Sequence, residues 1–149
     1  MIIATAGHVD HGKTSLVKQL SGVDTDRLEE EKQRGLSIEL GYAFLQADSS
    51  LNISFIDVPG HHRSINTMIS GVCSVDLALV VVAANEGPMP QTIEHLEVLR
   101  LLGVNQYVIV MTHIDKVDVS ERSGVAEALL ASIQTHIPMA SAPSFVVSN

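Results

Sequence analysis

The segment from Gly7 to Thr14 has the residue types and spacing of a loop that binds phosphate. It reads Gly-His-Val-Asp-His-Gly-Lys-Thr and lies between a short apolar run and a stretch with helical periodicity. Gly7 and Gly12 leave the backbone free to wrap around a phosphate with its N–H groups pointing inward. Lys13 can reach the outer phosphates, and the hydroxyl of Thr14 is a hard oxygen ligand that suits Mg²⁺. The residues that we expect to bind a nucleotide here are Gly7, His8, Val9, Asp10, His11, Gly12, Lys13 and Thr14.

A second candidate motif, Asp-Val-Pro-Gly-His, begins where an apolar run ends at Asp57. An aspartate at the carboxyl end of a strand beside a phosphate loop can hold a water bound to Mg²⁺. Gly60 offers a backbone N–H that is free to approach a terminal phosphate. His61 can then orient the attacking water, so we expect it to be catalytic. Asp-Val-Pro-Gly is by itself also a good turn, and its interpretation therefore depends on the phosphate loop.

A third candidate site, Thr112-His113-Ile114-Asp115, follows another buried strand. Asp115 can accept two hydrogen bonds from the N1–H and 2-amino groups of guanine, which adenine does not supply. His113 can pack its ring against the base, and Thr112 completes the predicted nucleotide contacts. The alternative is a polar loop with an ordinary aspartate.

The composition is that of one globular domain and excludes several other classes of protein. The chain has 149 residues and a formal net charge of −8, which argues against DNA as a partner. Its single cysteine, Cys73, forms no internal disulfide, and no apolar run is long enough to span a membrane. The seven histidines are scattered without the spacing of zinc ligands. We expect a cytoplasmic protein with no membrane partner.

The elements that must position these residues alternate along the chain. Apolar runs predict strands at residues 2–6, 42–47, 51–57, 77–84, 107–111 and 145–147. Helical periodicity predicts helices at residues 14–20, 65–72, 92–102 and 120–136. The pattern predicts an α/β fold, a P-loop NTPase domain with a mostly parallel sheet, one antiparallel edge strand and helices on both faces.

One polar stretch, residues 21–39, interrupts this alternation. A loop of this length inside a compact domain is usually functional or mobile. Its three consecutive glutamates, Glu29, Glu30 and Glu31, are expected to form a solvated face.

Three stretches of the sequence resemble the translational GTPases. They are the phosphate loop at 7–14, the motif at 57–61 and the sequence Gly-Pro-Met-Pro-Gln-Thr-Ile-Glu-His at 87–95. Within that family, residues 26–42 most resemble the bacterial selenocysteine-specific elongation factors. The threonine that opens residues 112–115 agrees better with that branch than with elongation factor Tu, although the family usually carries Asn-Lys-x-Asp there.

The resemblance implies roles for further residues. Residues 34–38 match the effector loop that folds over the triphosphate. In that loop Ser37 holds a position usually occupied by a threonine, whose hydroxyl ligates Mg²⁺ only in the triphosphate state. Asp10 lies where some members bind a monovalent cation, and Ser148 falls at the base-contacting turn, where the sequence departs from the family. The metal site implied in this way consists of Thr14, Ser37 and, through water, Asp57.

The resemblance also implies an activity and partners. It predicts binding of GTP or GDP with Mg²⁺ and a GTP hydrolysis that is slow without the ribosome. The ribosome and selenocysteyl-tRNA are the expected partners of the intact protein. Alternatives are the domain of another translational GTPase, similar to elongation factor Tu or an initiation factor, a nucleotide-binding fragment with negligible turnover, and a P-loop kinase that uses ATP.

Residues 1–149 are expected to form one GTP-binding domain that is truncated at its last strand. The family continues with β-barrel domains that hold aminoacyl-tRNA. The selenocysteine branch adds a C-terminal region that reads an mRNA hairpin.

Overall fold

The computed structural model describes residues 1–26, 28, 30–31, 37–60, 65–72, 74–137 and 143–147. Within this part of the chain six strands form one sheet in the order β2-β3-β1-β4-β5-β6. Strands β2 and β3 pair antiparallel, and every other pair of neighbours is parallel. The predicted sheet, with its antiparallel edge strand, is thus confirmed. The strands are β1 (Ile2–Ala6), β2 (Gly41–Gln46), β3 (Asn52–Asp57), β4 (Leu77–Ala83), β5 (Tyr107–Thr112) and β6 (Ser144–Val146).

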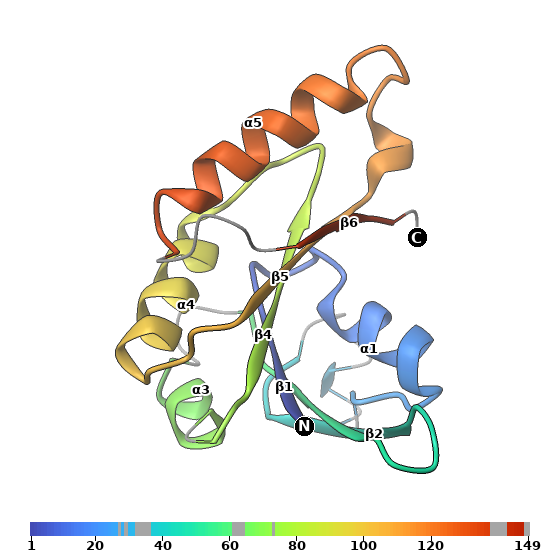
Figure 1. The fold of residues 1–149 in the computed structure, drawn as a ribbon, viewed down its shortest axis with the longest axis vertical. Helices are drawn as coiled ribbons and strands as arrows, with labels where there is room; N and C mark the ends of the chain where they lie inside the picture. The colour runs from blue at the N-terminus through green and yellow to red at the C-terminus, as the bar shows by residue number, and fades with distance from the viewer. Residues whose placement is uncertain are drawn as a thin grey trace.

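Helices cover both faces of this sheet, as predicted. Figure 1 shows α1 on one side of the sheet and α3, α4 and α5 on the other. The short 3₁₀ turn η2 (Ile114–Lys116) follows β5. Among the described residues, no helix has the length and the apolar character needed to cross a membrane. The helices are α1 (Lys13–Ser21), α3 (Ile65–Gly71), α4 (Pro90–Leu101) and α5 (Arg122–Gln134).

The continuous apolar run of β4 is explained by its place in the middle of the sheet. Val80 and Val82 pack into the core beneath α3, α4 and α5, while Leu79 and Val81 pack into the core beneath α1. A strand that is covered on both faces has no solvent-facing side, and its sequence therefore does not alternate.

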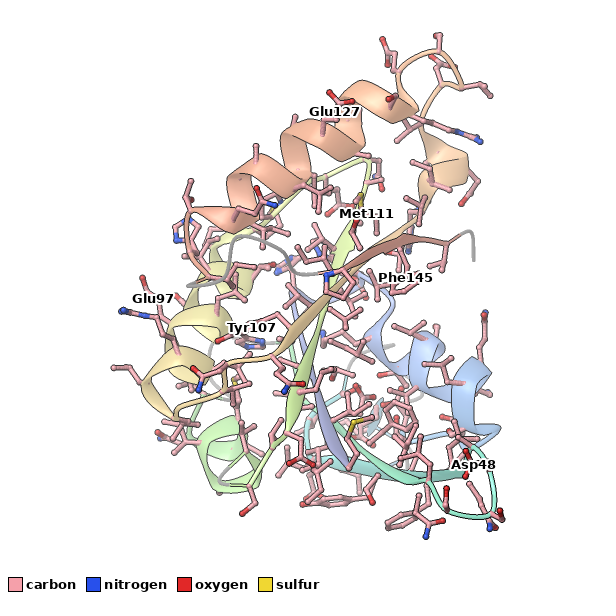
Figure 2. All side chains as sticks on the ribbon, viewed as in Figure 1. Asp48, Glu97, Tyr107, Met111, Glu127 and Phe145 are labelled. Atoms are coloured by element: carbon pink, nitrogen blue, oxygen red, sulfur yellow. The ribbon has the colours of Figure 1, made fainter. Side chains whose placement is uncertain are left out.

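The hairpin between β2 and β3 turns at Asp48, which lies at its tip (Figure 2). One carboxylate oxygen of Asp48 accepts hydrogen bonds from the backbone N–H groups of Ser50, at 2.7 Å, and Leu51, at 2.8 Å. These bonds lower the pKa of the Asp48 carboxyl, because they favour its charged form. The predicted turn is thus closed by an Asx-type contact.

Several element boundaries differ from the sequence prediction. Helix α4 begins at Pro90 rather than at residue 92, because proline is well suited to the first turn of a helix, where its missing N–H is not needed. Helix α5 begins at Arg122 and ends at Gln134, inside the predicted 120–136. The predictions for Cys73 and for residues 32–36 concern positions outside the described part of the chain.

Candidate functional site

The turn between β1 and α1 adopts a conformation that requires its glycines. Gly7 and Gly12 have φ values of +137° and +86°, in a region that side chains rarely occupy. A Cβ atom on Gly7 would also collide with the backbone oxygen of Val81 in β4. Asp10, with φ of +62°, is one of two non-glycine residues with positive φ in the described part of the chain. The loop therefore passes close to the sheet and opens directly into the N-terminus of α1.

Lys13 is the first residue of α1, and its side chain is buried in this loop. It is 6% exposed, and its ammonium group donates a hydrogen bond to the backbone oxygen of His8 at 2.7 Å. Burial lowers the pKa of Lys13 to about 8, and nearby carboxylates, with Asp57 the largest contributor, oppose that shift. A desolvated ammonium of this kind gains free energy when an anionic phosphate comes close to it.

Three residues that were predicted to hold Mg²⁺ lie together at the start of α1. The Thr14 hydroxyl donates to a carboxylate oxygen of Asp57 at 2.7 Å. The hydroxyl oxygens of Thr14 and Ser37 are 3.0 Å apart. Two hydroxyls and a carboxylate form a set of hard oxygen donors, which is what Mg²⁺ prefers. The residues therefore fit the ion that the sequence predicted.

Further polar side chains surround this cluster, and the sequence alone did not identify them. The hydroxyls of Thr5 and Thr25 donate to the two oxygens of Asp57, at 2.8 Å and 2.7 Å. The Ser37 hydroxyl donates to Asp26 at 2.7 Å, and burial raises the pKa of that carboxyl. The only sequence signal for Asp26 was its place at the start of the stretch that resembles the selenocysteine-specific factors.

A cavity of about 420 Å³ lies beside these groups. Asp24 and Lys18, which form an ion pair at 2.7 Å, also border it together with Asp26. Its lining includes eight of the predicted nucleotide-binding residues, which are Val9, Asp10, Gly12, Lys13, Thr14, Ser37, Gly60 and His113.

Gly60 packs against the phosphate loop. It is buried, and a Cβ atom at this position would lie 2.5 Å from the Lys13 ammonium nitrogen and 2.6 Å from the Val9 backbone nitrogen. The backbone that follows β3 therefore lies directly beside the loop. His61 and Ser148, the predicted catalytic residue and the predicted base-turn residue, lie outside the described residues.

The loop after β5 is tied to the phosphate loop. The Thr112 hydroxyl donates to the backbone oxygen of His11 at 2.8 Å, so threonine makes a polar contact at the place where the family usually has asparagine. His113 adopts φ of +56° and borders the cavity. Asp115 is exposed in the 3₁₀ turn and does not line the cavity.

Two fully buried histidines, His11 in the loop and His95 in α4, do not line the cavity. His95 of α4 accepts a hydrogen bond at Nδ1 from the Gly7 backbone N–H at 3.2 Å. Burial lowers its pKa to about 4, which keeps the imidazole neutral. The ring of His11 contacts that of His8, with centroids 5.1 Å apart, and burial also lowers the pKa of His11. The sequence predicted that His11 binds nucleotide, but its side chain is buried away from the cavity.

Comparison with known proteins agrees with this geometry. A family model for the elongation factor Tu GTP binding domain matches residues 1–147. A selenocysteine-specific elongation factor from Desulfomicrobium baculatum is 50% identical over 118 residues, which make up 79% of this chain and 19% of that protein. The chain therefore spans about a fifth of the length of this relative.

Two solved structures share the fold over 99% of the chain. A bacterial selenocysteine-specific elongation factor is 46% identical with a TM-score of 0.91, and the match covers 25% of its chain. The elongation factor SelB from Methanococcus maripaludis, in complex with the GTP analogue GppNHp, is 27% identical with a TM-score of 0.82, and 29% of its chain is covered. This chain belongs to the family of the elongation factor Tu GTP-binding domain, within which it is similar to the selenocysteine-specific elongation factors.

Proposed function

We propose that this domain binds GTP and GDP together with Mg²⁺ and hydrolyses GTP slowly on its own, as the switch domain of a factor that delivers selenocysteyl-tRNA to the ribosome. The observation that carries the proposal is the cluster of Thr14, Ser37 and Asp57 beside the buried ammonium of Lys13. This cluster borders a cavity that the phosphate loop also lines.

Each residue of this cluster has a separate role in binding a triphosphate. Lys13 and the backbone N–H groups of the loop bind the outer phosphates. The hydroxyls of Thr14 and Ser37 would ligate Mg²⁺, and Asp57 would hold a water bound to it. The ion would supply positive charge beside the phosphates.

Other residues would bind the base and orient the water. Asp115 accepts hydrogen bonds from guanine, His113 packs beside the base, and Thr112 holds their loop against the phosphate loop. His61 orients the attacking water. Neither of the described arginines, Arg100 and Arg122, lines the cavity.

Asp10 is the candidate for holding a monovalent cation. Asp10 lines the cavity, and its backbone has a positive φ of +62°. Potassium and sodium salts compared at equal ionic strength should then give different nucleotide affinities.

Nucleotide competition tests the binding proposal directly. Because the chain has no tryptophan, a fluorescent GDP analogue serves as the reporter. We expect GTP and GDP to displace it and ATP not to, and we expect EDTA to weaken binding. Equal displacement by ATP, or affinities that do not depend on Mg²⁺, would contradict the proposal.

The role in translation rests on the similarity to selenocysteine-specific factors and is tested in the intact protein. That protein should bind selenocysteyl-tRNA in its GTP form in preference to other elongator or initiator tRNAs, and ribosomes should accelerate its phosphate release. A preference for initiator tRNA would point to an initiation factor instead. Because ribosomes act in the cytoplasm, this role requires the cytoplasmic location that the sequence predicts.

A further inference from the structure

Glu31 is a buried carboxylate in the polar stretch of residues 21–39. Its side chain is 3% exposed, which contradicts the prediction that Glu29, Glu30 and Glu31 form a solvated face. Glu30, the residue before it, is exposed as expected. A buried carboxylate needs several hydrogen-bond donors to offset the loss of its hydration.

Backbone N–H groups that precede and follow Glu31 in the sequence supply those donors. One carboxylate oxygen of Glu31 accepts from the Leu28 N–H at 2.8 Å. The other accepts from the N–H groups of Ile38, at 3.0 Å, and Glu39, at 3.1 Å. Hydrogen bonds to an ionised acceptor are roughly twice as strong as neutral ones, so this carboxylate fixes the backbone that it contacts.

The backbone fixed in this way carries Ser37. Ile38 directly follows Ser37, and the Ser37 hydroxyl lies 3.0 Å from that of Thr14 and 2.7 Å from Asp26. A displacement of the Ile38 N–H would move this hydroxyl away from the cluster. Thr14 and Asp57 are held independently, because they belong to α1 and β3.

We propose that Glu31 is the positioning residue that holds Ser37 at the magnesium cluster and thereby sets the preference of the domain for GTP over GDP. The inference rests on the proposed function, in which Ser37 ligates Mg²⁺ only in the triphosphate state. Glu31 acts through Ser37 and does not itself contact the nucleotide.

Substitutions at Glu31 should change the affinity for the two nucleotides unequally. Glu31→Ala should weaken GTP binding by at least about tenfold and change GDP binding by less than about twofold. Glu31→Gln should fall between wild type and Glu31→Ala. Its amide oxygen can still accept from Ile38 and Glu39, whereas its NH₂ group would face the Leu28 N–H. Glu97→Ala removes the same charge from an exposed position on α4 and should leave both affinities unchanged.

A double-mutant cycle with Ser37→Ala separates this inference from the proposed function. If Glu31 acts through Ser37, Glu31→Ala should cause no further loss of GTP affinity in the Ser37→Ala background. Additive losses, or an equal loss of GTP and GDP affinity, would overturn the inference and assign Glu31 a general structural role. If Ser37→Ala alone leaves the ratio of GTP to GDP affinity unchanged, the proposed magnesium site itself is wrong. Thermal unfolding identifies folded variants, and Glu31→Gln replaces Glu31→Ala in the cycle if the alanine variant does not fold.

Discussion

At the scale of single residues, the site concentrates polar groups in places where burial makes them costly. Lys13, Asp57 and His95 are each at most 6% exposed. Asp57 is stabilised by hydroxyl donors from Thr5, Thr14 and Thr25. Lys13 has only a backbone oxygen as its hydrogen-bond acceptor in the described residues. The cost of burying the Lys13 charge is therefore compensated when phosphate binds.

Replacing Lys13 with methionine should separate stability from binding. Because burial lowers the pKa of Lys13 to about 8, its charged form is disfavoured in the nucleotide-free protein. Lys13→Met keeps most of the side-chain volume, so the free energy of unfolding should stay unchanged or rise by about 1 kcal/mol. GDP affinity should fall at least about tenfold, because one charge-assisted contact is lost. Urea unfolding and titration with a fluorescent nucleotide measure the two effects, and near-wild-type GDP affinity would contradict the assignment.

Gly60→Ala should disturb the phosphate loop. The added methyl group would lie 2.6 Å from the Val9 nitrogen, which belongs to the backbone and cannot rotate away. We expect a loss of about 1–3 kcal/mol in the free energy of unfolding, as for other overpacked sites, together with weaker GTP binding.

Gly124→Ala is the matched control for this change. Gly124 lies in α5, and a Cβ atom there would meet no heavy atom within 4 Å. The alanine should leave nucleotide binding unchanged and raise stability by up to about 1 kcal/mol, because glycine is a poor helix former. Equal effects of the two substitutions would show that Gly60 has no special contact with the loop.

At the scale of elements, the phosphate loop is held by neighbours that are distant in sequence. Helix α4 reaches it through the bond between His95 and Gly7, and β5 reaches it through the bond between Thr112 and His11. Asp57, the last residue of β3, accepts a hydrogen bond from Thr14 at the N-terminus of α1. The site therefore depends on contacts among several elements. A substitution in α4 should change the conformation or stability of the phosphate loop.

The coupling through His95 predicts a pH dependence of stability. Burial, followed by the charges of Lys13 and His8, lowers its pKa from 6.5 to about 4. The unfolded chain then binds this proton more tightly than the folded chain. The contribution of His95 to stability is full above about pH 6.5 and is lost as the pH falls toward 4. His11 shifts in the same direction and adds to the slope.

The variant His95→Asn tests this pH dependence of stability. The side-chain oxygen of asparagine can still accept from the Gly7 N–H, but asparagine does not titrate in this range. The free energy of unfolding of His95→Asn, measured in urea between pH 7 and pH 4.5, should fall less steeply than that of wild type. The difference should approach about 1 kcal/mol per pH unit. Parallel pH profiles would show that His95 is not buried as a neutral group.

At the scale of the whole molecule, the order and type of the elements followed from the sequence. Apolar periodicity located all six strands among the described residues. Strands β1 to β5 are each buried on at least part of their length, whereas β6 is exposed along its three residues and pairs with β5 alone. The phosphate loop was recognised because its glycines and lysine lie close together in sequence. The predictions for His61 and Ser148 stay predictions.

What the sequence did not reveal depends on contacts between distant segments. Glu31 is held in its buried position by backbone groups that precede and follow it in the sequence, and no periodic pattern encodes such contacts. Asp26 meets Ser37, and His95 meets Gly7, only after the chain has folded. In both cases the residue type was visible in the sequence and the partner was not.

The measurement that tests the central claim most directly is the base preference of Asp115→Asn. If Asp115 accepts from the N1–H and 2-amino groups of guanine, asparagine would turn an N–H donor toward the amino group. Xanthine presents a carbonyl oxygen there instead, and such mismatches discriminate strongly because they leave polar groups unpaired. Competition between GDP and xanthosine diphosphate should therefore show that wild type prefers GDP and that the variant binds GDP more weakly and xanthosine diphosphate better. A variant that keeps the wild-type preference for guanine would contradict the claim that this domain reads guanine through Asp115.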